Sequence, residues 1–402
     1  MKIDDNPIRT LPFPPWPHYD EDEIDAVAAV LRSGKVNYWT GDEARQFERE
    51  YAAYTHTQYA IALTNGTVAL ELALYAFGIG QGDEVITTSR TFIASASAAV
   101  MRGATPVIAD VDPVSQNISI DEIKRLTTDR TKAIIPVHLA GWPCDMEAIM
   151  AFANERGIKV IEDCAQAHGA TYKGLPVGSF GHAAAFSFCQ DKIITTGGEG
   201  GMLVTNNKEA WEKAWAYKDH GKSFDAIYNC SHPIGFRWLH ESFGTNWRMT
   251  ELQAVLGRIQ LGKLPTWTAQ RRKNAAILHK AFSGIEGLRV TTPGPEIGHA
   301  YYKYYVFLAL DKLCAGWDRD NVMQAIANEG IPCYSGSCSE IYLEKAFAGT
   351  PSLPLQRLPA ARLLGETSLM FMVHPTLDES VMQQTVAAVE KVIRRATTNT
   401  FP

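Results

Sequence analysis

The sequence lacks several features that would place the protein in a special class. It has no run of about 18 apolar residues, so we expect no membrane-spanning helix. Residues 1–6 lack the basic and apolar regions of a secretory signal peptide. Lysine and arginine total 38 against 44 aspartates and glutamates, so a net charge of −6 provides no basic excess for nucleic acid or an anionic membrane.

Cysteine is also scarce. The seven cysteines are scattered along 402 residues and include no CxxC pair. An odd number at these spacings is a poor disulfide framework and a poor zinc site. We therefore expect reduced, buried or partly buried thiols in a cytoplasmic protein.

What is present is an ordinary globular composition, with 46% hydrophobic and 20% charged residues. Between residues 59 and 204, short apolar segments alternate with segments of helical pattern. This alternation predicts an α/β fold, with a mainly parallel sheet covered by helices on both faces. The predicted strands are Tyr59–Leu63, Glu84–Thr87, Thr105–Ala109, Ala133–Val137, Lys159–Ile161, Ala183–Phe188 and Gly201–Val204.

The two ends of the chain follow other patterns. Residues 11–17 are proline-rich and predict an extended arm, after which apolar residues recur at helical spacing up to Gly34. The pattern changes again around Pro265, and a long polar helix is predicted over Thr268–Phe282. We therefore predict a large domain over residues 1–264 and a smaller α+β domain over 265–402.

In an open parallel sheet, ligands bind beyond the carboxyl ends of the strands. The first candidate there is the segment Thr64–Thr67, between a strand and a helix that starts near Val68. Free N–H groups at a helix start, beside a glycine that permits close approach, can hold a phosphate. The alternative is an ordinary turn in which Asn65 or Thr67 caps the helix.

The second candidate is Asp163, after the predicted strand Lys159–Ile161. A carboxylate at this edge of the sheet can hold a positively charged ligand nitrogen, since the attraction at ~3 Å is roughly 5 kcal/mol before desolvation. The alternative is a helix-capping aspartate.

The third candidate is Lys192, which lies between the strand ending near Ser187 and a turn rich in glycine. Partial burial lowers the pKa of a lysine and exposes its lone pair, so Lys192 is a candidate for a Schiff base. The alternative is a solvated loop lysine. Together, a phosphate cradle, a carboxylate and a lysine at one edge of a sheet are the groups that pyridoxal phosphate requires.

The chain resembles the DegT/DnrJ/StrS sugar aminotransferases, which are fold type I enzymes dependent on pyridoxal phosphate. The resemblance runs from about Tyr38 through Arg272 and continues more weakly to the C-terminus. The matching stretches are NGTVAL (65–70), TFIASA (91–96), PVHLAGWPCDM (136–146), EDCAQAHGA (162–170), SFCQDKIITTGGEGG (187–201) and GTNWRM (244–249).

The resemblance implies contacts to the cofactor ring. Lys192 matches the lysine that holds the cofactor and then acts as general base and acid. Asp163 matches the carboxylate that faces the pyridine nitrogen, and Gln166 matches a side chain near the ring oxygen. Phe92 matches the aromatic ring stacked on the cofactor; without the family it could be a core residue, and Gln166 a surface helix residue.

The resemblance also implies contacts to the cofactor phosphate. Gly66, Thr67 and Ser187 match phosphate contacts within one subunit. Asn246 matches an asparagine that reaches the phosphate from the second subunit, which implies a homodimer with shared active sites. As an alternative, Asn246 could cap a helix that starts near Thr250.

The family implies a reaction as well. We expect an amino group to pass from L-glutamate to a nucleotide-linked keto sugar, a 4-keto-6-deoxyhexose, for amino-sugar and surface polysaccharide synthesis. Relatives that dehydrate or deoxygenate sugars carry histidine in place of Lys192, so the lysine favours transamination. The GGEGG form with Glu199 resembles C4 more than C3 sugar aminotransferases.

Two alternatives to this reaction remain. The acceptor could be a C3 keto sugar or a cyclitol, or the protein could be a non-catalytic sugar or cofactor sensor. Retention of Lys192, Asp163 and Ser187 argues against a sensor.

Four other polar residues receive no catalytic role. We expect His138, His168 and His220 to be hydrogen-bonded structural residues, and Arg248 either to contact a substrate anion or to form a salt bridge.

Overall fold

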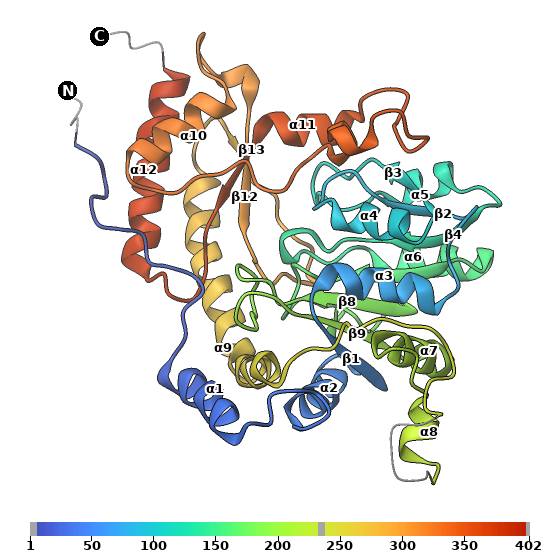
Figure 1. Cartoon of the computed structure of the whole chain (residues 1–402). Coiled ribbons are helices and arrows are strands. Elements are labelled where there is room, and N and C mark those ends of the chain that lie inside the picture. The colour runs from blue at the N-terminus through green and yellow to red at the C-terminus, as the bar shows by residue number, and fades with distance from the viewer. Residues whose placement is uncertain (1–5, 232–237, 399–402) are drawn as a thin grey trace.

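The central layer of the protein is a seven-stranded sheet (Figure 1). The computed structural model describes residues 6–231 and 238–398. Most of residues 1–6, in which no signal peptide is expected, therefore lie outside the described part. The strand order is β1-β9-β8-β5-β4-β2-β3. The strands are β1 Tyr59–Leu63, β2 Glu84–Thr88, β3 Thr105–Ala109, β4 Thr131–Ile135, β5 Lys159–Asp163, β8 Ala183–Ser187 and β9 Gly201–Thr205.

The sheet is mainly parallel, as the alternation of strands and helices predicts. The neighbours β3, β2, β4, β5 and β8 pair in parallel, whereas β9 pairs antiparallel with both β8 and β1. The largest difference in position is at β4, which starts and ends two residues before the predicted strand.

Helices cover both faces of the sheet because successive side chains of each strand point to opposite faces. On one face, Leu63 and Ile161 pack into a core with helices α3, α4 and α7. On the other face, Ala62 packs into a core with α2 and α9, and Val160 packs into a core with α5 and α6. The helices are α2 Glu43–Tyr54, α3 Gly66–Ala76, α4 Ala94–Met101, α5 Ile120–Leu126, α6 Met146–Arg156, α7 Lys208–Lys218 and α9 Glu251–Phe282. A short helix, α8 Phe224–Tyr228, follows α7.

A second, smaller sheet lies beside the first (Figure 1). Its order is β10-β12-β13, and it shares a core with the end of α9 and with α10 and α12. These elements are β10 Leu288–Arg289, β12 Tyr304–Leu308, β13 Ser368–Phe371, α10 Arg319–Asn328, α11 Pro359–Thr367 and α12 Glu379–Thr397. A third set of short strands consists of β6 Thr171–Tyr172, β7 Leu175–Pro176 and β11 Ile297–Gly298.

Helix α9 is longer than predicted and corrects the predicted start at Thr268. It runs for 32 residues and contains Pro265. Proline removes a single N–H donor from the helix, and the packing of both halves stabilises the helix across this position. Ala254 and Leu264 belong to the core of the large sheet, whereas Leu278 belongs to the core of the small one. The predicted boundary at residues 264/265 therefore falls inside a continuous helix, and the division into two domains remains a prediction.

The proline-rich arm runs from the small sheet towards helix α1, Glu21–Ser33 (Figure 1). The Arg9 N–H donates to the Glu329 carbonyl at one end of the arm. At the other end, the Trp16 ring packs edge-on against Trp267 of α9, with ring centroids 5.1 Å apart. Helix α1 ends as predicted at Gly34, which has a left-handed φ of 69°.

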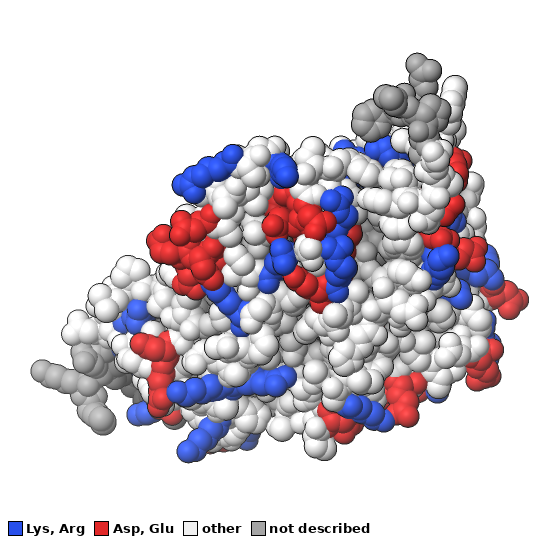
Figure 2. Space-filling model, turned by 90° about the horizontal axis from the view of Figure 1, so that it is seen from below, with Lys and Arg blue, Asp and Glu red and all other residues white. Residues whose placement is uncertain are grey.

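Charged side chains of both signs are intermixed on the face shown in Figure 2. Ion-pair networks bring such charges together, as around Lys263, whose Nζ lies within 3 Å of carboxylate oxygens of Asp20, Asp22 and Glu23. Among the described residues, none of the helices is long and apolar enough to cross a bilayer.

Candidate active site

The start of helix α3 and the end of strand β8 form a narrow cradle. Asn65 caps α3 by accepting the Val68 N–H at 3.0 Å, so the capping alternative is correct for this residue. Gly66 and Thr67 follow in the first turn and line a cavity. A Cβ atom at Gly66 would lie 2.6 Å from the Ser187 Cβ, closer than side chains approach. Glycine therefore brings the helix start against Ser187, and the cap and the cradle exist together.

Asp163 lies at the carboxyl end of β5, where its side chain is buried. Its Oδ2 accepts a hydrogen bond from the Ser95 hydroxyl at 2.8 Å, and its Oδ1 accepts one from the Ala165 N–H at 3.1 Å. Burial raises the pKa of Asp163, while these two hydrogen bonds and the charge of Lys192 act in the opposite direction. The result is a desolvated carboxyl group that a cationic partner would stabilise as the anion.

Lys192 follows β8 in the loop before the glycine-rich turn. Its Nζ lies 3.6 Å from the Asp191 Oδ1 and 3.4 Å from the Tyr302 hydroxyl, which itself donates to Asp191. Its backbone carbonyl accepts the indole N–H of Trp16 at 2.9 Å. The side chain is 18% exposed, so the amine is positioned by the protein yet open to a ligand.

Two adjoining cavities meet at Lys192. The first, which we call the strand-end cavity, has a volume of about 640 Å³ and lies at the carboxyl ends of the large sheet. The second, the tyrosine cavity, has a volume of about 720 Å³ and is lined by Tyr302, Tyr305 and Tyr334 from the region of the small sheet. Both are also lined by Thr91, Phe92, Gln166, Asp191 and Lys192.

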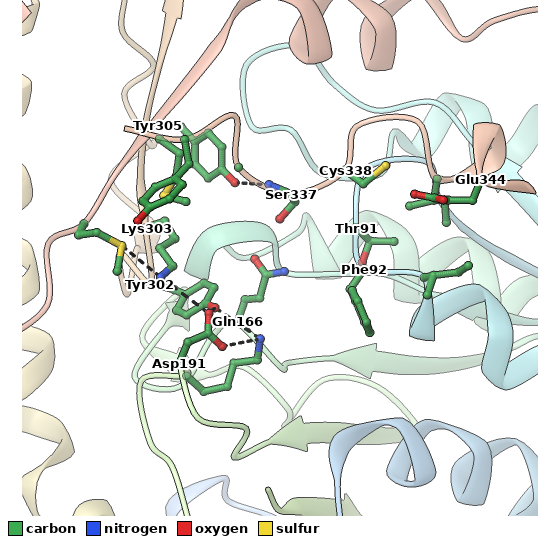
Figure 3. Close-up of a pocket in the computed structure, with 17 residues that line it drawn as sticks. Thr91, Phe92, Gln166, Asp191, Tyr302, Lys303, Tyr305, Ser337, Cys338 and Glu344 are labelled. Carbon is green, nitrogen blue, oxygen red and sulfur yellow. Dashed lines mark hydrogen bonds and ion pairs between the residues drawn. The ribbon is translucent and has the colours of Figure 1, made fainter. Parts of the chain in front are cut away.

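The strand-end cavity brings together seven of the eight residues that the sequence singles out. They are Gly66, Thr67, Phe92, Asp163, Gln166, Ser187 and Lys192. Phe92 is 69% exposed, so it is not a core residue. Gln166 is buried and its Oε1 accepts the Ala140 N–H at 2.8 Å, so it is not a surface helix residue. Figure 3 shows Gln166 between Asp191 and Phe92.

Asn246 is the one of the eight residues that does not line the strand-end cavity. It is exposed and lines neither cavity. It does not cap α9, because that helix is capped by Thr250, whose hydroxyl accepts the Gln253 N–H. Arg248 forms a salt bridge with the buried Asp219, which confirms the structural alternative for this arginine. A role for Asn246 in a second subunit remains a prediction.

Two of the three histidines, His138 and His168, have structural surroundings. The two ring nitrogens of His168 contact the Tyr51 hydroxyl at 2.8 Å and the Ser187 carbonyl at 2.9 Å. Burial lowers the pKa of His168 to about 4, so the ring stays neutral. His138 contacts Glu162 and the Cys144 N–H in the same way. His220 is exposed and lines neither cavity.

The lining of the tyrosine cavity is what reasoning from the sequence missed. Tyr302, Lys303 and Tyr305 lie within the segment Tyr301–Tyr305, and Ser337 comes from the loop that follows α10. The Ser337 N–H donates to the Tyr305 hydroxyl at 2.8 Å, which joins these two parts (Figure 3). The run YYKYY at 301–305 is an unusual concentration of tyrosines and was the available signal.

Comparison with known proteins identifies the family. The family model for the DegT/DnrJ/EryC1/StrS aminotransferase family matches residues 17–390. An X-ray structure of an aminotransferase from Psychrobacter cryohalolentis is 57% identical, with a TM-score of 0.95 over 96% of this chain and 100% of that one.

Two curated relatives are each 36% identical. The GDP-perosamine synthase of Caulobacter vibrioides matches over 382 residues, 94% of this chain and 97% of that protein. A pleiotropic regulatory protein of Geobacillus stearothermophilus matches over 367 residues, 91% and 92% of the two chains. The fold is that of the fold type I aminotransferases, and the chain belongs to the DegT/DnrJ/EryC1/StrS aminotransferase family.

Proposed function

We propose that this aminotransferase uses pyridoxal phosphate to move an amino group from L-glutamate to a nucleotide-linked keto sugar. The observation that carries the proposal is the strand-end cavity, which places the Gly66–Ser187 cradle, the buried Asp163 and the Lys192 amine around one volume. A phosphate, a protonated ring nitrogen and an aldehyde are the groups that these three features suit.

The residues present fit the cofactor. The first turn of α3 and Ser187 would hold the phosphate, since the glycine at position 66 lets the helix start lie against Ser187 at the wall of the strand-end cavity. Asp163 would face the ring nitrogen, and a positive charge there would offset the burial that raises the pKa of this carboxyl. When bound, pyridoxal phosphate supplies an electron-withdrawing ring that accepts the electron pair left at the donor's α carbon.

Lys192 performs the proton transfer. Its amine would take a proton from the α carbon of the donor as general base and then deliver it, as general acid, to the cofactor carbon that carries the donor nitrogen. Asp191 and the Tyr302 hydroxyl lie beside the Nζ and hold it at the junction of the two cavities. A primary amine kept within reach of the reacting carbon is worth roughly 10²–10⁴ in rate.

The acceptor would enter through the tyrosine cavity, which opens from Lys192 and whose volume suits a sugar ring. We propose a nucleoside diphosphate 4-keto-6-deoxyhexose, aminated for amino-sugar and surface polysaccharide synthesis. The relative named as a GDP-perosamine synthase supports a nucleotide-linked sugar. Glu199, which lines the strand-end cavity, favours C4 over the alternatives of a C3 keto sugar and a cyclitol.

A homodimer and a cytoplasmic location belong to the same proposal. Asn246 is exposed and lines neither cavity of its own subunit, which suits a residue offered to a second copy. The seven cysteines are free, which suits a reducing compartment.

A panel of nucleotide-linked keto sugars tests the proposal. The purified protein, loaded with pyridoxal phosphate, is incubated with L-glutamate and each sugar, and the product is identified by its mass. We expect one 4-keto sugar to gain an amino group and borohydride to fix the cofactor on Lys192. A protein that binds cofactor or sugar without amination would instead support a sensor, the candidate that the relative named a regulatory protein favours.

A further inference from the structure

Lys303 is a second amine in the tyrosine cavity, which Lys192 also lines. Figure 3 shows Lys303 near Tyr302 and Asp191. Its side chain is only 10% exposed. Within the described part of the chain, its Nζ donates to the Met372 Sδ at 3.3 Å, and its carboxylate neighbour is Asp191, with Oδ2 at 3.8 Å. A thioether is a weak acceptor, so this nearly buried ammonium has no strong hydrogen bond of its own.

Asp191 cannot neutralise Lys303 alone, because the same carboxylate serves other groups. The Tyr302 hydroxyl donates to its Oδ2, and the Lys192 Nζ lies 3.6 Å from its Oδ1. Behind Tyr302, the buried Arg271 donates to the Tyr302 carbonyl at 3.3 Å and adds another positive charge. Burial, together with Arg271 and Lys192, lowers the pKa of Lys303 to about 8. An anion placed at its Nζ would therefore be stabilised.

We propose that Lys303 binds the α-carboxylate of the amino-acid donor. This inference rests on the proposed function, under which the donor nitrogen must reach the place of the Lys192 Nζ. Lys192 and Lys303 lie beside the two oxygens of one carboxylate, that of Asp191. A carboxylate joined to the donor nitrogen through a single carbon can therefore reach Lys303.

The proposal makes Lys303 a specificity residue for amino acids over simple amines. The cofactor phosphate has its own cradle at Gly66 and Ser187, on the side of Lys192 that faces the strand-end cavity. Lys303 lines the tyrosine cavity and not the strand-end cavity, so its charge is available to the donor.

Three amino-acid donors that differ in one amide group distinguish the role of the α-carboxylate from that of the side-chain carboxylate. L-glutamate carries both, L-glutamine lacks the side-chain carboxylate, and L-isoglutamine lacks the α-carboxylate. The experiment measures, without acceptor, the second-order rate constant at which each donor removes the absorption band of the lysine-bound cofactor. The variants are Lys303→Met and Lys303→Gln, which remove the charge at similar size. The matched control is Lys273→Met, since Lys273 is 61% exposed on α9.

We expect both Lys303 variants to lower the rate constants for L-glutamate and L-glutamine about 10- to 100-fold, the factor for one hydrogen bond to a charged group. The rate constant for L-isoglutamine should not change. α-Methyl-L-glutamate, which has no α hydrogen and cannot react further, should bind more weakly by the same factor at equilibrium. The affinity for pyridoxal phosphate itself should equal that of the unsubstituted protein.

Other outcomes overturn the inference. Equal losses with L-isoglutamine and L-glutamate, or a loss confined to the sugar acceptor, would place Lys303 elsewhere in the site. Unchanged rates in a protein that responds to L-glutamate would refute the inference and leave the proposed function intact. An unsubstituted protein that takes up no pyridoxal phosphate, or that no amino donor affects, would overturn both.

Discussion

The two cavities that meet at Lys192 are built in different ways. The strand-end cavity takes its polar groups from the ends of β1, β5 and β8 in one sheet, so parallel strands bring Gly66, Asp163 and Ser187 together. The tyrosine cavity takes its polar groups from the segment Tyr302–Tyr305, which leads into β12, and from loops near β13, where packing of the small sheet sets their positions. The first follows from local sequence pattern, and the second only from tertiary structure.

Lys192→Ala removes the group that the two cavities share and should have the largest effect. We expect the rate of the half-reaction with L-glutamate to fall by about 10⁴-fold or more, because the covalent attachment and the proton transfer are lost together. Stopped-flow absorption measures this rate, with Lys273→Ala as the control. A variant that retained turnover would show that Lys192 does not carry out the chemistry.

Asp163→Asn tests the strand-end cavity. The side chain keeps its size and one acceptor for the Ser95 hydroxyl, but it no longer stabilises a protonated ring nitrogen. We expect kcat to fall about 10²- to 10³-fold, as for other charge-stabilising groups in enclosed sites, with little change in the preference among donors. A change in donor preference without a loss in kcat would contradict the separation of the two cavities.

The same variant has a pH-dependent effect on stability without cofactor. The pKa of Asp163 is raised in the folded protein above 3.8, so folding favours the protonated carboxyl, and that stability is lost as pH rises through the folded pKa. Asp163→Asn should therefore raise the melting temperature of the cofactor-free protein more at pH 7.5 than at pH 4. Scanning calorimetry measures the melting temperatures. An equal increase at both pH values would show that Asp163 is not a destabilising buried carboxylate at pH 7.5.

Gly66→Ala tests the cradle at the far end of the strand-end cavity. The added Cβ would lie 2.6 Å from the Ser187 Cβ, so the helix start has to move. Overpacking of this kind costs about 1–3 kcal/mol, and we expect about 10- to 100-fold weaker binding of pyridoxal phosphate. Gly262→Ala is the control, since a Cβ there meets nothing within 4 Å. Equal affinities of the two variants would rule out the cradle.

Trp16→Phe should have the smallest effect. It removes the indole N–H that the Lys192 carbonyl accepts at 2.9 Å and keeps most of the ring. We expect the arm to hold the lysine loop in place. The loss of about 1 kcal/mol should therefore slow the half-reaction with L-glutamate roughly fivefold. Trp267→Phe is the control, because it shares the ring contact without a bond to Lys192. Similar effects of both variants would assign Trp16 a packing role only.

The sequence alone predicts the large sheet well because each strand is short, apolar and bounded by turn residues. Asp163 and Ser187 end their strands, so their place at the ligand edge follows from topology. Lys303 could not be placed in this way. A lysine among tyrosines resembles an edge-strand residue, and only the packing of β12 beside the Lys192 loop brings it to the site.

The extent of α9 was missed for a related reason. Pro265 is a local signal for a break, but side chains distant in sequence hold the helix together on both sides of it. Asn246 differs again, since its predicted contact lies in a second subunit and one chain does not test it.

The continuity of α9 has a consequence for how the molecule denatures. Its first half completes the core around Ala254 and Leu264, and its second half completes the core around Leu278 and Phe282. Melting of either core would strip the apolar partners from half of a single helix and weaken the other half. The two cores are therefore expected to lose their structure together, in one cooperative transition rather than as independent folding units.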